Sequence, residues 1–561
     1  MDNTLFSGTN ELKAPFGLSE SQFQEIGPRL TPNNIECIKK EYKRIDRTPS
    51  YDELKIYAAI LEARRRSATG YLISGLKSDS IALRETYSDL LQKANAVFEK
   101  KTAGLSLDDA AYICGEYMRY IGRRDRLTPL CSDTDGVGDN ALSLFGDDGG
   151  AALVFGKKTK KKKPPRVGKI GNGYAVLLLD GEKYDLSSAS FFSDREVDLS
   201  YNFKVKIGAY GLVGALCALT RGARVDTARL SSDIPRDKLL TGAFWGKHLV
   251  FCPKNNIKLI SDKAVEYGLN AIYFANTKKD EMLTTRDMAL PMRLLRALSD
   301  STTEVTVSPV EPNLSTSHKR PVTAQTKDGS SQIADDGLTA HGGRIISPIY
   351  VCPDENSFGE AVNSLTDALL SLVARGVDRR AVCSAVSYEL LRRGISEKEL
   401  GESLALILGV YRVGVELALS EGITDVKYTD RRSLLAALYA EKPRNIIENK
   451  FVKNGSRLAL LSLGTGSDGL VDFSDIRSVC DRFTELCKEG KVYSARAVSG
   501  DLSAVIDAMS GVLTAELSNE GKALTGIGYR GILFETDGDS ELNMIGKVIN
   551  TPHADVNLTD C

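Results

Sequence analysis

Three glycines at intervals of three residues, preceded by two lysines, are the residues best placed to do chemistry. Gly208, Gly211 and Gly214 stand at the expected entrance of a helix, in the sequence KIGAYGLVGAL. Backbone amides of such a turn can hold a phosphate, and Lys204 and Lys206 add positive charge beside it. The alternative is a tight turn with close helix packing. The segment therefore predicts either a nucleotide or phosphate site or a packing device.

Two further patterns lack the spacing that their chemistry requires. The sequence GTGSDG at 464–469 has the GxGxxG pattern of a dinucleotide turn, but LVDF separates it from the helix expected at Ser474. The aspartates Asp133, Asp135 and Asp139 lack the spacing and the closing glutamate of an EF-hand calcium loop. We interpret the first pattern as a turn and the second as part of an acidic, glycine-rich loop.

The charge balance gives no general attraction to a charged partner. The 73 Lys and Arg residues match 74 Asp and Glu residues, so a nucleic acid, a membrane surface or an acidic substrate is not favoured. The basic run KKTKKKK at 157–163 has no interleaved aromatic residue for base stacking. We interpret this run as a solvated loop, with a nucleic-acid contact as the alternative.

The cysteines and histidines do not form a metal-binding pattern. The chain has ten cysteines without a CxxC pair and only four histidines, which argues against zinc. Neither a signal-peptide pattern nor a run of about 18 apolar residues is present. We therefore expect a cytoplasmic protein with unpaired thiols at all ten positions, namely Cys37, Cys114, Cys131, Cys217, Cys252, Cys352, Cys383, Cys480, Cys487 and Cys561.

The elements that would position these residues follow from capping and periodicity. Thr31 and Pro32 predict the start of a helix, and Ser50 with Glu53 has the spacing of a capping box. Further helices are expected at 81–100, 107–120, 211–225, 357–374 and 397–420, and strands at 174–179 and 345–352. The length of 561 residues predicts three or four domains.

Two helices on either side of residues 301–343 have the same apolar spacing. Leu212, Ala215, Leu216 and Leu219 precede Arg221-Gly222, just as Leu365, Ala368, Leu369 and Leu372 precede Arg375-Gly376. The pattern predicts an internal duplication in which 166–280 superposes on 344–455 with Gly222 near Gly376. The alternative is chance similarity between amphipathic helices.

Several segments, in order along the chain, resemble the formylglycinamidine ribonucleotide amidotransferase (phosphoribosylformylglycinamidine synthase) family. The segment 35–66 is similar to its helical linker domain. Segments 171–192 and 206–232 are similar to its first aminoimidazole-ribonucleotide-synthetase-type N-terminal domain, and 347–382 and 399–423 to the second copy. Segments 488–511 and 531–536 resemble its final domain. Together these segments cover about half of the chain.

This resemblance implies an α+β fold with tandem synthetase-like domains and an N-terminal helical linker domain. The expected boundaries are a helical linker-like domain at 1–66, a partly helical insertion ending in a basic loop at 67–165, a first N-terminal-type domain at 166–300, a disordered linker at 301–343, a second N-terminal-type domain at 344–454 and a C-terminal-type domain at 455–561. The linker assignment rests on its Ser, Thr, Pro, Gly and Asp content.

The resemblance also shows which of the family's catalytic residues are replaced. Where relatives have a Ser-Glu-His-Cys motif this chain has Ala63 in place of the histidine. Lys183 lies in the segment that matches a histidine-rich motif, and Cys217 matches a magnesium-binding aspartate. Only Ser499 survives from a C-terminal His-Asp-x-Ser-Asp-Gly-Gly motif. Lysine does not replace an imidazole as a base that titrates near neutrality.

The family's metal and nucleotide have few remaining candidate ligands. Glu182 and Asp185 could restore two metal-binding carboxylates if the register shifts, and MgATP is the cofactor that the resemblance implies. We expect a catalytically inactive relative that acts as a binding or assembly module, as a homodimer or with a purine-pathway partner. The alternative is an active ATP-dependent ligase with replaced residues, and a third possibility is a structural protein outside the family.

Overall fold

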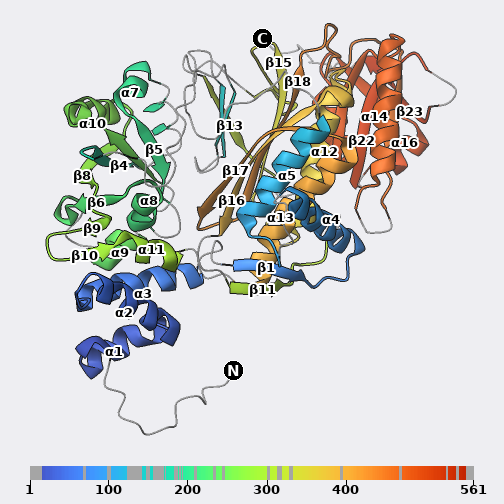
Figure 1. Cartoon of the computed structure of the whole chain (residues 1–561). Coiled ribbons are helices and arrows are strands. Elements are labelled where there is room, and N and C mark those ends of the chain that lie inside the picture. Colours follow the sequence, from blue (N-terminus) through green and yellow to red (C-terminus); the bar gives the residue numbers. More distant parts are fainter. Residues whose placement is uncertain are drawn as a thin grey trace, which may run out of the picture.

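The computed structural model describes residues 15–550 except for a set of short internal segments. The segments outside the description are 67–70, 98–102, 123–141, 147–151, 156–169, 171, 182–186, 189–190, 193, 208–210, 231–235, 243–246, 300–302, 313–318, 327–332, 392–395, 467–469, 526–527 and 539–541. Helices and sheets are mixed throughout (Figure 1). No helix in the described part of the chain is long and apolar enough to cross a membrane.

The N-terminal helices form where the caps predict them. Ser19 caps α1 (Glu20–Ile26), and Thr31 caps α2 (Pro32–Arg44), whose first residue is a proline. Helix α3 (Tyr51–Arg66) follows a capping box in which the Glu53 amide donates to Ser50 Oγ and the Ser50 amide donates to Glu53 Oε2. The buried residues of these helices share one hydrophobic core with the next sheet. The N-terminal helices therefore pack directly on the first sheet unit.

The first sheet unit (residues 170–299) is a seven-stranded sheet with helices on both faces. Its strand order is β10-β9-β6-β8-β4-β7-β5. The strands are β4 (Ala175–Asp180), β5 (Phe203–Lys206), β6 (Gly222–Val225), β7 (His248–Cys252), β8 (Asn270–Lys278), β9 (Met282–Thr284) and β10 (Ala289–Pro291). One face packs on the N-terminal helices together with α8 (Gly211–Leu219), α9 (Arg236–Thr241) and α11 (Met292–Ser299). The other face packs on α7 (Arg195–Ser200) and α10 (Ile257–Glu266).

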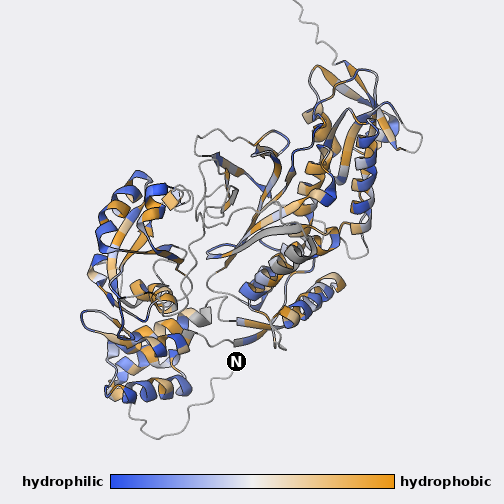
Figure 2. Cartoon of the chain, turned by 45° about the horizontal axis from the view of Figure 1, so that its top comes forward, coloured by the Kyte–Doolittle hydropathy of each residue, from blue (hydrophilic) through white to orange (hydrophobic). Residues whose placement is uncertain are grey.

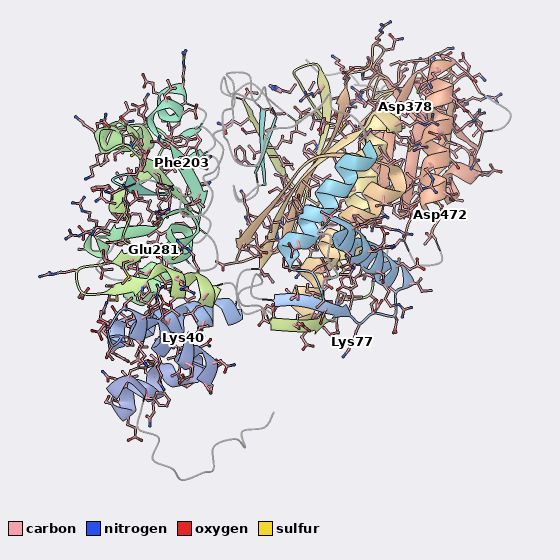
Figure 3. All side chains as sticks on the ribbon, viewed as in Figure 1. Lys40, Lys77, Phe203, Glu281, Asp378 and Asp472 are labelled. Carbon is pink, nitrogen blue, oxygen red and sulfur yellow. The ribbon has the colours of Figure 1, made fainter. Side chains whose placement is uncertain are left out.

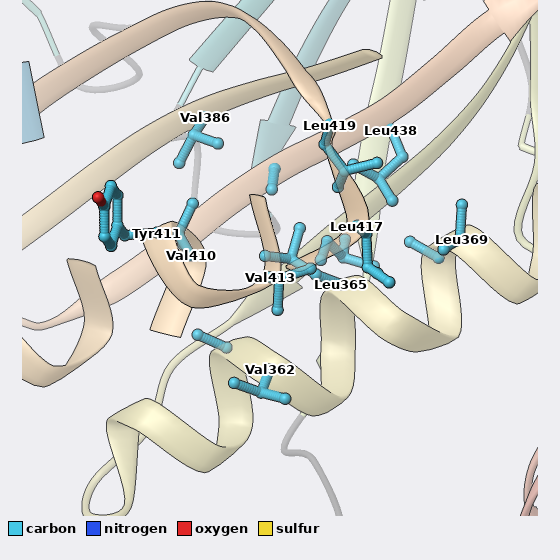
Figure 4. Close-up of a cluster of buried hydrophobic side chains, with 14 of the residues drawn as sticks. Val362, Leu365, Leu369, Val386, Val410, Tyr411, Val413, Leu417, Leu419 and Leu438 are labelled. Atoms are coloured by element: carbon cyan, nitrogen blue, oxygen red, sulfur yellow. The ribbon is translucent and has the colours of Figure 1, made fainter. Parts of the chain in front are cut away.

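The central unit (residues 71–155 and 303–441) contains the longest buried helices. Its main sheet has the order β12-β15-β18-β16-β17, with β14 (Thr339–His341) added to β15. The strands are β12 (Lys319–Arg320), β15 (Arg344–Val351), β16 (Cys383–Leu391), β17 (Ser420–Thr429) and β18 (Ser433–Glu441). Helices α12 (Ser357–Ala374) and α13 (Glu397–Leu417) pack together beside this sheet, as Figure 4 shows for Val362 and Leu365 of α12 and Val413 of α13.

Two smaller sheets and two further helices complete the central unit. The opposite face of the main sheet contacts a three-stranded sheet of β13 (Val322–Thr326), β2 (Leu142–Gly146) and β3 (Ala152–Phe155). Helices α4 (Ile81–Val97) and α5 (Leu107–Gly122) join the core of α12 and α13. Strands β1 (Tyr71–Leu76) and β11 (Thr303–Val307) pair in parallel. Apolar residues follow the packed faces of these elements (Figure 2).

The C-terminal unit (residues 451–550) is a five-stranded sheet with the order β20-β22-β19-β23-β21. Its strands are β19 (Arg457–Ser462), β20 (Ser494–Asp501), β21 (Leu513–Leu517), β22 (Gly528–Thr536) and β23 (Met544–Asn550). Helix α14 (Phe473–Lys488) lies on the face that joins the core of the central unit. Helix α15 (Leu502–Met509) packs on the other face of this sheet. Helix α16 (Asn519–Ala523) follows β21 along the chain.

The prediction that 166–280 and 344–455 are two copies of one unit is wrong. The order of the strands instead relates the first sheet unit to the C-terminal unit. The path β6-β8-β4-β7-β5 of the first sheet unit repeats as β21-β23-β19-β22-β20 in the C-terminal unit, and every neighbouring pair is antiparallel in both. The sheet of residues 344–441 instead contains the parallel pair β16 and β17. Gly222 begins β6, whereas Gly376 follows α12 with a φ of 89°. Apolar spacing followed by Arg-Gly is therefore a property of amphipathic helices and not of one repeated unit.

The prediction of a disordered linker at 301–343 also needs correction. The segment 301–343 contributes β11, β12, β13 and β14, so its described part is not a disordered linker. Its strands are short and polar, but they are stabilised by backbone hydrogen bonds to strands of other segments. The helices predicted within 67–165 are present, and their buried residues belong to the main core of the central unit. The basic run at 157–163 lies outside the described residues.

Candidate functional site

The glycine turn predicted to hold a phosphate leads into a closely packed helix. Gly211 is the first residue of α8, with a φ of 61°, and a Cβ there would lie 2.4 Å from the backbone carbon of Thr241. This close approach of α8 to α9 explains the need for glycine at this position. Gly214 is half-buried within α8, and Gly208 lies outside the described residues.

The lysine before this turn lies on the other face of the sheet. Phe203, labelled on β5 in Figure 3, and Val205 belong to the same core as α8. The alternating side chain of Lys204 therefore points away from α8. Its Nζ lies 3.6 Å from the ring centre of Phe192 in the opposite core. The side chain of Lys206 is outside the description. The structure therefore does not bring Lys204 to the helix entrance, and a phosphate site there stays a prediction.

The other chemical candidates are not assembled into a metal site in the described ranges. Glu182 and Asp185 lie outside these ranges, and no group of three or more His, Cys, Asp or Glu residues within them could hold a metal ion. Burial raises the pKa of the Cys217 thiol to about 12, and its sulfur lies 3.2 Å from that of Met292. The structure records no disulfide among the eight cysteines that it describes.

A polar stripe on the buried helix α12 forms the candidate site. Glu360, the adjacent pair Asn363 and Ser364, Asp367 and Ser371 follow one another at steps of three or four residues along one side of α12. Such spacing places side chains on one helix face. Glu360, Asn363, Ser364 and Asp367 are buried. A buried polar stripe is costly unless other polar groups meet it, so its partners identify the site.

Asp367 is the centre of these contacts. Its Oδ2 accepts a hydrogen bond of 2.6 Å from Lys319 Nζ on β12, and its Oδ1 accepts one of 3.2 Å from Arg530 Nε on β22. Ser499 Oγ on β20 lies 3.4 Å from the same lysine nitrogen. We call Lys319, Asp367, Ser499 and Arg530 the Asp367 seam, because they join the edge of the central sheet to the C-terminal unit.

The Asp367 seam is an ion-pair cluster with one buried carboxylate and two cations. The side chain of Asp367 is 4% exposed, whereas those of Lys319 and Arg530 are 35% and 16% exposed. Each carboxylate oxygen therefore already has a cationic partner. A metal ion at this position would have to displace a lysine or an arginine from Asp367. Because two cations face one carboxylate, the seam carries net positive charge and favours an anion.

A small cavity extends the polar stripe by one helical turn. Its volume is about 40 Å³, and we call it the Arg375 cavity. Its lining consists of Asp336, Ser371, Ala374, Arg375, Asn449, Ala495, Arg496 and Ala497. The lining therefore comes from the loop before β14, the end of α12, the segment before the C-terminal unit and strand β20. It lies between the central and C-terminal units, as the Asp367 seam does.

A second ion pair fixes α14 against the turn that follows α12. Arg379 donates two hydrogen bonds of 2.8 and 2.9 Å to the carboxylate of Asp481 on α14, and Arg380 donates one of 3.2 Å. Asp378, labelled in Figure 3, begins this turn and caps it by accepting from the Arg380 amide. The side chain of Asp481 is 34% exposed. Here, too, one carboxylate lies between two cations.

This pair should make part of the stability depend on acid pH. The hydrogen bond from Arg379 lowers the pKa of Asp481, helped by its positive charge and by Arg380. Because the folded pKa is depressed, the stabilisation is present above the ordinary aspartate pKa of about 3.9 and is lost as pH falls through the folded value. We expect the difference in urea midpoint between wild type and Asp481→Asn to narrow as the pH is lowered below about 4. A difference that stays constant with pH would contradict this cause.

Sequence reasoning identified only Ser499 of the Asp367 seam. Asp367, Lys319 and Arg530 were not predicted, because neither cation is within one helical turn of the carboxylate in sequence. One signal was available: the helix at 357–374 has a polar stripe as well as an apolar one although it is buried on all sides. A buried helix with polar residues at helical spacing predicts a polar partner surface.

No family model and no curated protein matches the chain. Among solved structures, it is similar to Thermotoga maritima PurL complexed with FGAR at 11% identity, covering 92% of this chain and 100% of that one, with a TM-score of 0.49. Phosphoribosylformylglycinamidine synthase II from the same organism matches at 12% identity, with 92% and 100% covered and a TM-score of 0.46. Thiamine monophosphate kinase from Aquifex aeolicus matches at 12% identity, with 39% and 88% covered and a TM-score of 0.29. The structures that match nearly the whole chain thus carry the name of the family that the sequence resembles, at low identity throughout.

Proposed function

We propose that the chain is a phosphoribosylformylglycinamidine synthase-like protein that acts as a binding or assembly module and does not catalyse the family's ligase reaction. The observation that carries this proposal is the state of Asp367. It is a buried carboxylate that pairs with Arg530 of the C-terminal unit, and Lys319 and Arg530 occupy both of its oxygens. ATP-dependent chemistry of this kind needs carboxylates that hold a metal ion against the phosphates.

The described residues of the seam do not fit MgATP. The Arg375 cavity, at about 40 Å³, is smaller than the roughly 300–1,000 Å³ of ordinary ligand pockets. The residues that match the family's catalytic positions support the same proposal, because Ala63 on α3 has no titratable group and Cys217 is buried against Met292. A nucleotide at the glycine turn near Gly211 stays a separate prediction, since part of that turn is outside the description.

The ancestry of the chain is part of the same proposal. The sequence resemblance follows the family's order along the chain, and the first sheet unit and the C-terminal unit have the same strand order. We infer that these two units derive from one duplicated domain. A second copy of this chain or a protein of purine biosynthesis is the partner that we propose for the assembly role.

The decisive test is a coupled assay of ADP release with formylglycinamidine ribonucleotide, ammonia and MgATP. We expect no turnover above the rate without enzyme, because the described seam lacks a free carboxylate for the metal. Turnover on the order of 1 per second, the ordinary enzyme range, would overturn the proposal. The Glu182→Ala, Asp185→Ala double variant is the control for that outcome. Loss of turnover in the double variant would assign the metal site to these two carboxylates and support the active-ligase alternative.

A further inference from the structure

The Arg375 cavity contains guanidinium groups whose hydrogen-bond donors are not satisfied. Arg375 Nε and Nη1 and Arg496 Nη1 are buried, and within the described part of the chain they have no hydrogen-bond acceptor. Arg375 Nε forms an ion pair with Asp336 Oδ2 at 3.5 Å and Arg496 Nη1 one with Asp335 Oδ2 at 3.8 Å, but neither contact is a hydrogen bond. Arginine does not lose its proton in proteins, so these donors need an acceptor from elsewhere.

We propose that the Arg375 cavity binds a small tetrahedral oxyanion, of which inorganic phosphate is the simplest form. Two guanidinium groups, one from the end of α12 and one from β20, line the cavity and carry planar N–H donors, which match phosphate and sulfate oxygens. Ser371 and Asn449 add a hydroxyl and a side-chain amide to the lining. The proposal goes beyond the binding-module function, because it holds whether or not the ligase reaction occurs.

The charges around the cavity favour an anion. Arg375, Arg496 and Lys450 are the cations, and Asp335 and Asp336 are the acids, which leaves one positive charge in excess. Both acids already have partners. Asp335 accepts from Asn449 Nδ2 at 3.2 Å and pairs with Lys450 Nζ at 3.2 Å. Asp336 accepts from the Leu338 amide at 3.2 Å. The unsatisfied donors are therefore those of the two arginines.

The size of the cavity limits what it can hold. One water needs about 10–15 Å³ of such volume, so the cavity of about 40 Å³ has room for a few waters or one oxyanion. Water can also accept from arginine, but it does not neutralise the excess charge. A phosphate group on a larger molecule could enter with the rest of the molecule outside. The shared chemistry is the oxyanion, and the experiment below separates the two sources.

The test measures phosphate binding to the full chain by titration calorimetry in a buffer held at constant ionic strength with NaCl. We expect saturable binding with one site per chain for inorganic phosphate, and Arg496→Gln should weaken it at least tenfold. Arg477→Gln is the matched control, because Arg477 is a 39% exposed arginine on α14 that pairs with Glu416 outside the cavity. Its affinity should stay within twofold of wild type. Glycerol 3-phosphate in place of phosphate distinguishes an ester group from the free ion.

Two results would overturn the proposal. If titrating phosphate releases no more heat than titrating NaCl, the cavity holds water only. If Arg496→Gln binds phosphate as tightly as wild type, the bound ion lies elsewhere. If Arg496→Gln loses its folded circular dichroism spectrum, Ser371→Asp replaces it, because this change puts a carboxylate in the cavity without removing an arginine. It should weaken phosphate binding by the same factor, and unchanged binding would again contradict the assignment. The ADP-release assay is independent of either outcome.

Discussion

Replacing Asp367 with asparagine is expected to lower the free energy of unfolding at the boundary of the central and C-terminal units by about 3 kcal/mol. The change leaves Lys319 and Arg530 facing each other without the carboxylate that holds both. Removing one partner of a buried ion pair costs about 3–5 kcal/mol. We take the lower end, because the side chain of Lys319 is 35% exposed and can regain water.

Hydrogen exchange across a urea series is the suitable measurement, because a chain of several units has no single unfolding transition. Peptides of α12, β20 and β22 should lose protection in Asp367→Asn, while peptides of the first sheet unit should not. The control is Asp481→Asn, which also removes a carboxylate held by two arginines but one that is 34% exposed. We expect its effect to stay within about 1 kcal/mol. Equal effects of the two variants would show that the seam is not an effectively buried ion pair.

Glu53→Gln is expected to lower the free energy that holds the N-terminal helices to the first sheet unit by about 3 kcal/mol. The side chain of Glu53 is fully buried, and its two oxygens accept from Arg47 Nη2 at 2.6 and 2.9 Å. They also accept from the amides of Ser50 at 2.8 Å and Ala289 at 2.7 Å. In glutamine one of the two acceptor oxygens is replaced by an NH2 group, which donates and cannot accept. At least one of the buried N–H groups that Glu53 binds would therefore lose its partner.

The matched control for Glu53 lies in the same helices. Glu25 is 55% exposed and accepts from the Tyr51 hydroxyl and pairs with Lys55. Glu25→Gln should leave exchange of the α2 and α3 peptides close to that of wild type, because an exposed ion pair contributes little to stability. Limited proteolysis and exchange of the α2 and α3 peptides would measure both variants. If Glu53→Gln leaves exchange in α3 and β10 unchanged, then apolar packing alone holds the helices to the sheet.

Local elements of this fold could be predicted from the sequence because their causes are local. Thr31 and Ser50 cap helices as expected, since a hydroxyl and a backbone amide three residues on suffice to define each start. The strand at 174–179 and the helix at 357–374 were also placed correctly to within a residue. Long-range strand pairing could not be inferred in the same way. The first sheet unit and the C-terminal unit have the same strand order, but their helices have no common sequence pattern that would reveal it.

The candidate site was largely beyond sequence reasoning for the same reason. Asp367 lies 48 residues from Lys319 and 163 residues from Arg530, and no periodic signal joins them. The glycine turn was found because its spacing is local. Its packing against Thr241 in α9 emerges only in the fold. Composition was misleading for 301–343, because short polar strands take their stability from hydrogen bonds to partners elsewhere in the chain.

The hydrogen bond from the Ala289 amide to Glu53 joins residues 236 positions apart. When the N-terminal helices are synthesised, the strand that supplies this bond therefore does not yet exist. Their shared core includes Leu54 and Tyr57 of α3, and it also needs Leu290 and Leu295. At roughly 5–20 residues per second, a ribosome takes about 10–50 s to supply the missing part. During that time the apolar face of α3 has no sheet to cover it. We therefore expect the nascent chain to expose this apolar face until the end of α11 has emerged from the ribosome.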